Sequence, residues 1–216
     1  ANYGTDGQVL TSGGAGAAVA WEDAGGGDVV CDTSPQLGGN LDIQARLLVG
    51  NGGSTGIAIS SAGEVTMAAQ PAVAAVNSSC DCNQTGSGDL ATIEFDTEVF
   101  DVNADFNNGT DTFTAPITGK YLVSMNVEAS GWTTAISPHG QSQINIVSSN
   151  RTWSKQFGKP TPAVGTSHSE SMTAVIDMDA ADTLTVTYAI NGESSAVVDI
   201  VGAANPRTFL TVLLVA

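Results

Sequence analysis

One short run holds three of the chain's six cationic residues together with two aromatic rings. Arg151, Lys155 and Lys159 alternate with Trp153 and Phe157. In an extended strand all five side chains point to the same side. A face of this composition can stack sugar rings and pair with anionic groups. The alternative is that the aromatics enter the core or a subunit interface while the cations pair with the chain's many carboxylates.

A second feature that can bind a ligand is a tryptophan between glycine and threonine residues. Trp132 lies in a stretch that we predict to be a loop. Loops on a rigid scaffold often carry binding contacts, so an exposed Trp132 is a candidate contact, and the alternative is that it caps the end of a sandwich. Together with Arg151, Trp153 and Lys155 it forms our candidate ligand-binding set.

Oxygen-bearing side chains alternate in one loop-like stretch, at Asp101, Asn103 and Asp105. Carboxylate and amide oxygens are the ligands that calcium prefers. The stretch is not an EF-hand loop, because Phe106 occupies its sixth position and Thr112 its twelfth. The alternative is ordinary turn-forming Asp and Asn. Calcium is the one ion that we consider here, and we otherwise expect no cofactor.

The chain's three cysteines do not match a common framework. Cys31 stands alone, whereas Cys80 and Cys82 form a Cys-Asp-Cys pair. An odd number is no disulfide framework, and the pair lacks the Cys-x-x-Cys spacing of a zinc site. Free thiols and a cross-chain link in an oligomer remain the two alternatives.

Catalytic patterns are weak throughout. The segment 52–56 matches Gly-x-Ser-x-Gly, but the strand-to-helix context of a hydrolase elbow is missing. Neither His139 nor His168 has a spaced Cys, His or carboxylate that would suggest a triad or a metal site. We therefore predict that the protein is not an enzyme.

Composition indicates a mostly β chain that is strongly acidic. Its 216 residues include 25 Gly and only 13% charged residues, with a net charge of −16. A strongly negative protein is a poor partner for nucleic acid or anionic membrane, since both need Lys and Arg. No apolar run approaches the roughly 18 residues of a membrane span, and no signal peptide is recognisable at the start. We expect strands at the following segments: 73–76, 93–99, 121–127, 143–147, 152–157, 171–178, 183–190, 196–201 and 208–215.

A ladder of anchors runs through the middle of the chain at regular gaps: Phe95, Asp101, Phe106, Phe113, Gly119 and Tyr121. It resembles the signature of C1q-like domains, relatives of the tumour-necrosis-factor (TNF) jelly roll, although Val123 and Met125 replace the last two aromatics of that pattern. The resemblance implies a homotrimer whose last strand lies near the threefold axis, and several such heads bind calcium near the trimer apex. The residue types alone lead to the same interpretation, in which these anchors are core residues of a sandwich.

Residues 1–70 differ from the rest, being rich in Gly, Ala and Ser with only two aromatic residues. The segments Gly4–Asp23 and Asp32–Asp42 resemble modules of bacteriophage tail fibres and other appendages. In such fibres these pieces form intertwined trimeric β shafts. A single copy has too little apolar surface to fold alone, so oligomerisation is favoured on physical grounds as well. The alternative is a disordered linker.

We therefore predict an all-β homotrimer, with a fibrous shaft and virion-attachment region over 1–70 and a C1q/TNF-like jelly-roll head over 71–216. The resemblances imply a non-enzymatic virion fibre or spike protein, made in the host cytoplasm. Its knob would bind a host surface glycan or protein, and its N-terminal region would contact other virion proteins. The alternatives are a capsid-decorating head fibre or cement protein and a secreted C1q-like lectin or ligand.

Overall fold

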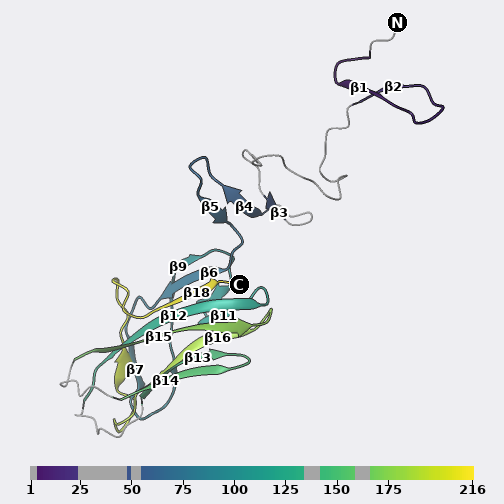
Figure 1. Cartoon of the computed structure of the whole chain (residues 1–216). Helices are drawn as coiled ribbons and strands as arrows, with labels where there is room; N and C mark the ends of the chain where they lie inside the picture. The colour runs from purple at the N-terminus through teal and green to yellow at the C-terminus, as the bar shows by residue number, and fades with distance from the viewer. Residues whose placement is uncertain (1–3, 24–47, 50–54, 134–141, 159–165) are drawn as a thin grey trace. The chain divides into compact units, whose positions relative to one another are not determined.

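The computed structural model describes residues 4–23, 48–49, 55–133, 142–158 and 166–216, and every regular element among them is a β-strand (Figure 1). The prediction of an all-β fold is confirmed. In these residues we find no helix with the length and apolarity to cross a membrane. The chain forms two compact units, Ala1–Gln44 and Ala45–Ala216. The boundary that we placed between residues 70 and 71 remains a prediction.

Small sheets occupy the described part of the first 70 residues. In the first unit, β1 (Gln8–Thr11) pairs with β2 (Ala20–Asp23) in an antiparallel hairpin. In the second unit, β3 (Leu48–Val49), β4 (Gly56–Ile59) and β5 (Val65–Met67) form a three-stranded antiparallel sheet. Cys31 and most of the Gly-x-Ser-x-Gly match lie outside the described residues.

The larger sheet of the head has seven strands in the order β7-β17-β12-β18-β6-β9, with β15 on the free side of β12. The bounds are β6 Ala72–Val76, β7 Asp81–Thr85, β9 Thr97–Asp101, β12 Gly119–Ser130, β15 His168–Met178, β17 Val198–Ile200 and β18 Phe209–Leu214. All pairs are antiparallel. The last strand of the chain is thus central, between β12 and β6.

The second sheet has six strands in the order β10-β11-β16-β13-β14, with β8 also paired to β16. The bounds are β8 Ala91–Thr92, β10 Phe106–Asn107, β11 Thr112–Thr114, β13 Ser142–Ser148, β14 Thr152–Phe157 and β16 Thr183–Ala189. The two sheets share one hydrophobic core, so the head is a jelly-roll-like sandwich.

The anchors of the ladder lie in this core. Phe95, Phe106, Phe113 and Tyr121 are buried. The rings of Phe113 and Tyr121, one from each sheet, meet edge to face with centroids 5.5 Å apart. The Tyr121 hydroxyl donates to the carbonyl of Ile117 at 2.7 Å, so its polar end is satisfied. Aromatic pairs from opposite sheets therefore hold the sandwich together at this point.

Gly119 is required by the close approach of the C-terminus. A Cβ at this position would lie 2.6 Å from Leu214 Cδ1 and 2.7 Å from the carbonyl oxygen of Ala216. Both are shorter than real Cβ contacts, and one partner is backbone. The glycine of the ladder therefore makes room for the end of the chain.

One predicted strand is wrong in its bounds. We expected a half-buried strand over 93–99, whereas the regular strand, β9, begins at Thr97 and its Val99 is exposed. Phe95 donates its N–H to the Asp111 carboxylate at 2.7 Å rather than to a neighbouring strand. A side chain thus replaces the ladder bond, which ends regular pairing while keeping Phe95 in the core.

Candidate functional site

The candidate ligand-binding residues lie where the edges of the two sheets meet. Among the described strands, β14 pairs only with β13 and β15 only with β12, so each presents an open edge. Two hydrogen bonds and one ion pair from the β14 side chain Lys155 reach β15. We call this the β14–β15 edge, defined by Arg151, Trp153, Lys155, His168 and Glu170.

Lys155 links the two sheets at this edge. Its Nζ lies 2.7 Å from Glu170 Oε2 and donates to the Ser171 carbonyl at 3.0 Å. His168 Nε2 lies 2.9 Å from the other Glu170 oxygen, Oε1. Partial burial would raise the pKa of Glu170, but hydrogen bonds from Lys155 and His168 outweigh it and hold that pKa below its ordinary value. The carboxylate is therefore ionised, with a cation and an imidazole around it.

One aromatic ring of the run enters the core and the other packs against it. Phe157 is buried, with its ring centroid 5.7 Å from that of Tyr188 and 5.8 Å from that of His168. Trp153 is half-buried and packs against the core. The guanidinium of Arg151 lies over the Trp153 ring, 5.7 Å from its centroid, and 3.8 Å from an Asp177 oxygen.

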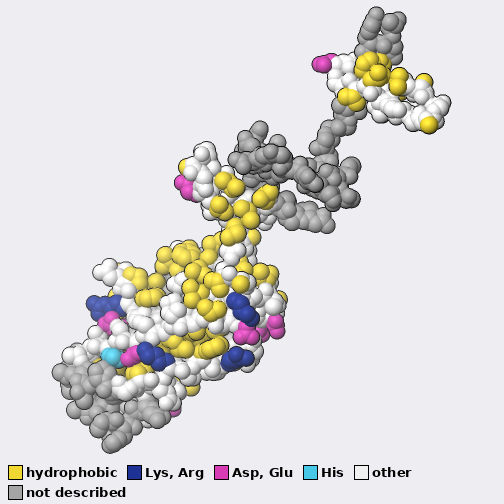
Figure 2. Space-filling view, viewed as in Figure 1, with side chains coloured by type: hydrophobic (Ala, Val, Ile, Leu, Met, Phe, Trp, Pro, Cys, Tyr) yellow, Lys and Arg dark blue, Asp and Glu magenta, His cyan; other side chains and the backbone are white. Residues whose placement is uncertain are grey.

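This arrangement follows the second of our two interpretations, in which aromatics pack and cations pair with carboxylates. Figure 2 shows Lys and Arg side chains on this side of the head standing beside Asp and Glu side chains. Arg151 and Lys155 remain exposed all the same, so their role in binding stays a prediction. Lys159 and His139 lie outside the described residues.

Trp132 is not an exposed contact. Only 3% of its side chain is accessible, and it belongs to the hydrophobic core. The following residue, Thr133, is bonded through its N–H and its hydroxyl to the Glu193 carboxylate, at 3.1 and 2.8 Å. The tryptophan therefore caps the sandwich while its neighbour fixes the backbone, and it can support a binding loop only indirectly.

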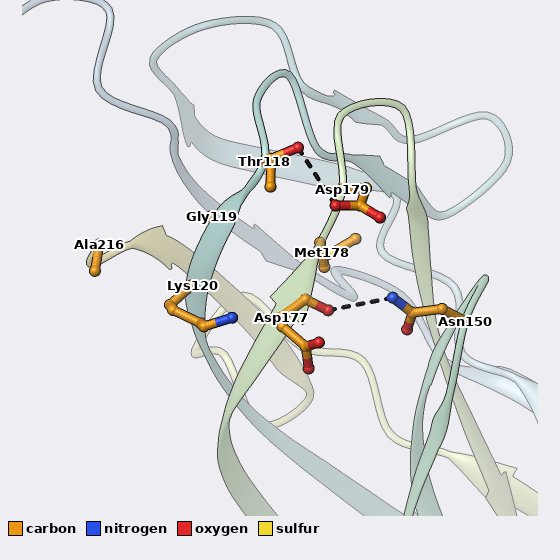
Figure 3. Close-up of a pocket in the computed structure, with 8 residues that line it drawn as sticks. All are labelled: Thr118, Gly119, Lys120, Asn150, Asp177, Met178, Asp179 and Ala216. Atoms are coloured by element: carbon orange, nitrogen blue, oxygen red, sulfur yellow. Dashed lines mark hydrogen bonds between the residues drawn. The ribbon is translucent and has the colours of Figure 1, made fainter.

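A small pocket lies beside this edge, where β12 begins and β15 ends (Figure 3). Its volume is about 290 Å³, and its polar side chains are those of Thr118, Lys120, Asn150, Asp177 and Asp179. Asn150 donates to the Asp177 carbonyl at 3.4 Å. The pocket volume is at the lower limit for ligand pockets. The pocket suits one polar or charged group rather than a whole oligosaccharide.

The candidate calcium loop is held by its own side chains. Both oxygens of Asp101 accept backbone N–H groups, from Asp105 at 3.0 Å and Phe106 at 2.9 Å. The amide nitrogen of Asn103 donates to Asp105 Oδ1 at 3.0 Å. Burial raises the pKa of Asp105. These bonds explain the Asp and Asn residues as turn formers, and calcium at this loop stays a prediction.

The sequence analysis did not identify the side chains on β15 that pair with these cations. Glu170 and Asp177 belong to β15, and His168 and Glu170 are two residues apart on one strand face. That spacing was the available signal. What the sequence did not reveal was that a side chain of β14 reaches β15, which belongs to the other sheet.

Comparisons with known proteins give structural likeness only. No protein-family model matches the chain, and no curated protein sequence matches it. Similar solved structures include the globular domain of zebrafish complement 1qA protein, with a TM-score of 0.48 and 16% identity over 68% of this chain and 98% of that chain. Crystal structures of murine APRIL at pH 8.5 and pH 5.0 have TM-scores of 0.45 and 13% identity over 68% of this chain and 99% of theirs.

Proposed function

We propose that the chain is a non-enzymatic structural protein of a bacteriophage virion, a homotrimer whose knob binds a host surface glycan or protein. The observation that carries the proposal is the apolar surface that a single copy leaves exposed. The phage assignment rests on the resemblance of Gly4–Asp23 and Asp32–Asp42 to appendage modules. The trimer and the binding role rest on the surfaces that follow.

The N-terminal sheets are too thin to bury their apolar residues. Among the residues before Pro71 whose burial the structure describes, none is buried. Val9, Leu10 and Val19 of the first hairpin region are all at least half exposed, and Ile59 and Val65 of the three-stranded sheet are also exposed. Isolated two-stranded ribbons are marginal in water. Sharing of these side chains among copies of the chain supplies the missing core.

The outer face of the seven-stranded sheet carries an apolar row. Val175, Leu122, Leu213 and Ala72 lie directly opposite one another on β15, β12, β18 and β6. Val175 is 54% exposed and the other three are half-buried. A solvated face of an antiparallel sheet normally carries polar residues. The row is therefore the surface on which the copies of the head pack together.

Figure 2 supports this placement. Hydrophobic side chains gather on the part of the head where β6, β9 and β18 lie in Figure 1. Such a patch on a protein with net charge −16 marks an interaction site rather than ordinary surface. Packing through the outer face of one sheet leaves the β14–β15 edge open for a partner.

The β14–β15 edge is the proposed receptor contact. Arg151 and Lys155 are exposed. Each lies beside a carboxylate, but their cationic N–H groups still offer donors to an anionic partner on a protein that otherwise repels an anionic cell surface. Trp153 is half-buried beneath the Arg151 guanidinium. Anionic sugars or acidic protein groups would bind here, and binding would weaken as salt rises.

The test is the double variant Arg151→Ala with Lys155→Ala, assayed for adsorption to host cells and for native mass. The control is Arg207→Ala, which removes a cation outside this edge and its neighbouring pocket. We expect adsorption to fall at least tenfold in the first variant alone, with the trimer intact. Unchanged adsorption, or an equal loss in both, would contradict the receptor contact.

A second experiment separates the alternative functions. An antibody against the head, imaged on intact particles, should label a projecting fibre or spike. Uniform labelling of the shell would favour the capsid-decorating alternative. A particle-free, secreted chain that binds a soluble receptor would favour the C1q-like ligand.

A further inference from the structure

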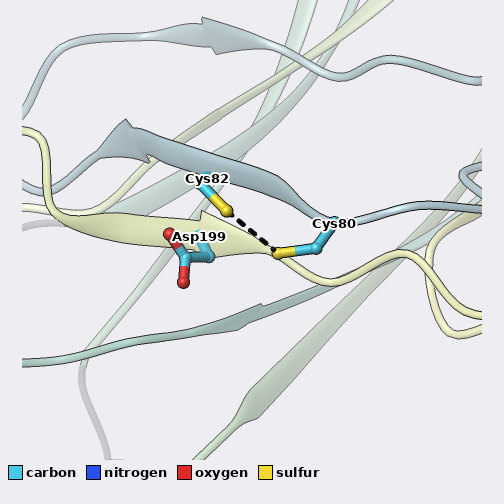
Figure 4. A group of neighbouring side chains, drawn as sticks. All are labelled: Cys80, Cys82 and Asp199. Carbon is cyan, nitrogen blue, oxygen red and sulfur yellow. Dashed lines mark hydrogen bonds between the residues drawn. The ribbon is translucent and has the colours of Figure 1, made fainter.

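Two cysteines and an aspartate, distant in the sequence, meet at one end of the seven-stranded sheet (Figure 4). Cys80 directly precedes β7, Cys82 lies within it, and Asp199 is the central residue of the neighbouring β17. Their ligand atoms, two sulfurs and a carboxylate oxygen, all lie within 4.8 Å of one another. Asp199 was missing from our sequence interpretation, which judged the cysteine pair by its spacing alone.

The distance between the two sulfurs matches that of two thiolates bound to one metal ion. Cys80 Sγ and Cys82 Sγ are 3.7 Å apart. Two thiolates on one tetrahedral zinc, each about 2.3 Å from the metal, lie about 3.8 Å apart. A disulfide instead requires sulfurs about 2.05 Å apart. Residues two apart in an extended strand have Cα atoms about 6.6 Å apart, close to the upper limit for a disulfide.

The backbone around the pair holds the carboxylate in place. Asn83, the residue after Cys82, has a positive φ of 56°. Its N–H donates to Asp199 Oδ1 at 2.7 Å. The pairing of β17 with β7 shifts register between Val198 and Ile200, at Asp199 itself. This bulge and the left-handed residue aim the carboxylate at the sulfurs, in the way that outer hydrogen bonds orient metal ligands.

The lack of a side chain at Gly131 leaves room for the Asp199 carboxylate. A Cβ at Gly131 would lie 2.9 Å from Asp199 Oδ2. Gly131 also has a φ of +84°, which residues with side chains rarely adopt. The position of Asp199 is thus fixed from two sides, by the Asn83 amide and by the absence of a side chain at Gly131.

We propose that Cys80, Cys82 and Asp199 form a binding site for a thiophilic divalent cation of the zinc type. Two sulfurs and one carboxylate oxygen supply three ligands, which leaves one tetrahedral position for water or another donor. Both cysteines are exposed, so an ion reaches them without opening the fold. The ion would bridge the edge strand β7 to β17 and stabilise that end of the sheet by binding the folded chain alone.

The experiment uses the full chain under a non-chelating reductant, with Zn²⁺ and Co²⁺ as probes. Calorimetry should give one Zn²⁺ per chain, and Co²⁺ should produce a thiolate-to-cobalt charge-transfer absorption. Cys80→Ser and Cys82→Ser should each weaken Zn²⁺ binding at least tenfold and remove that absorption. Asp199→Asn should weaken binding while the absorption persists, because both thiolates remain. Cys31→Ser is the matched control and should change nothing.

Other outcomes overturn the site. Co²⁺ binding without the charge-transfer absorption would mean surface carboxylates only. An equal loss of Zn²⁺ binding in Cys31→Ser would mean that the metal-binding thiolates lie elsewhere. A stable Cys80–Cys82 disulfide in the untreated chain would show a redox pair instead. Thermal unfolding without metal controls for folding. The Ser variants should unfold as the parent does, because both thiols are exposed.

Discussion

Lys155 and Glu170 join the open edges of the two sheets, with Nζ of one 2.7 Å from Oε2 of the other. Glu170 is only 14% exposed, whereas Lys155 is 44% exposed. The Lys155 ammonium also donates a hydrogen bond to the Ser171 carbonyl of the edge strand β15. Charged side chains on edges protect sheets from pairing with other chains. The same lysine therefore protects an edge and presents charge to solvent.

Loss of the cross-sheet pair should destabilise the head. Lys155→Ala leaves the Glu170 carboxylate with His168 as its remaining side-chain partner. Because the pair is partly exposed, we expect a loss of about 1 kcal/mol in urea unfolding. Lys120→Ala is the control, because Lys120 makes no ion pair within the described part of the chain. Equal losses in the two variants would show that the pair contributes nothing specific.

Gly119→Ala should destabilise the head by about 1–3 kcal/mol, as overpacking does. The new methyl group would clash with Leu214 and with the Ala216 carbonyl. Gly158→Ala is a matched control, since among the described residues no atom outside its chain neighbours lies within 4 Å of a Cβ there. Chemical unfolding of both variants measures the difference. A tolerated Gly119→Ala would mean that the C-terminus moves aside without cost.

Asp81 gives a pH dependence of known sign. Burial raises its pKa to about 6, and the nearby Glu94 carboxylate adds to the effect. The pKa of Asp81 is higher in the folded than in the unfolded chain. Its contribution to the free energy of unfolding is therefore complete below about pH 4 and is lost as the pH rises through 6.

Asp81→Asn should therefore stabilise the protein by about 1 kcal/mol at pH 8, after allowance for solvent screening. It should have little effect at pH 4, where the native side chain is also neutral. Melting temperatures of both proteins across this range test the prediction. A gain that is larger in acid would reverse the sign and contradict it.

The apolar row predicts which surface substitution breaks the oligomer. Val175→Asp places a charge on the outer face of the seven-stranded sheet and should shift the native mass toward the monomer. Leu90→Asp is matched, because Leu90 is also 54% exposed and lies outside the strands of that sheet. Dissociation caused by Leu90→Asp but not by Val175→Asp would move the interface away from the row.

Local patterns predicted most strands of the head. Thr152–Phe157 agrees with β14 residue for residue, and the predicted strand 183–190 exceeds β16 by one residue. Alternation and β-branched residues are local properties, so they can be read along the chain. The break before β9 was not predictable, because it depends on Asp111 accepting the Phe95 N–H from 16 residues away.

The candidate sites were predictable only in part. The run from Arg151 to Phe157 identified the cations and rings, but its partners lie on β15, in the other sheet. Trp132 looked like a loop residue, and its burial is decided by the packing of the core around it. Asp199 reaches Cys80 and Cys82 only through the pairing of β7 with β17. Each failure concerns a contact between residues far apart in sequence.

The central claim is that three copies share the apolar surface that one copy exposes. Native mass of the full chain in solution, by light scattering or sedimentation, tests it most directly. The account predicts three times the chain mass of 21.8 kDa, unchanged on dilution through the micromolar range. A stable, folded monomer would contradict both the shared shaft and the packing of the heads through the apolar row.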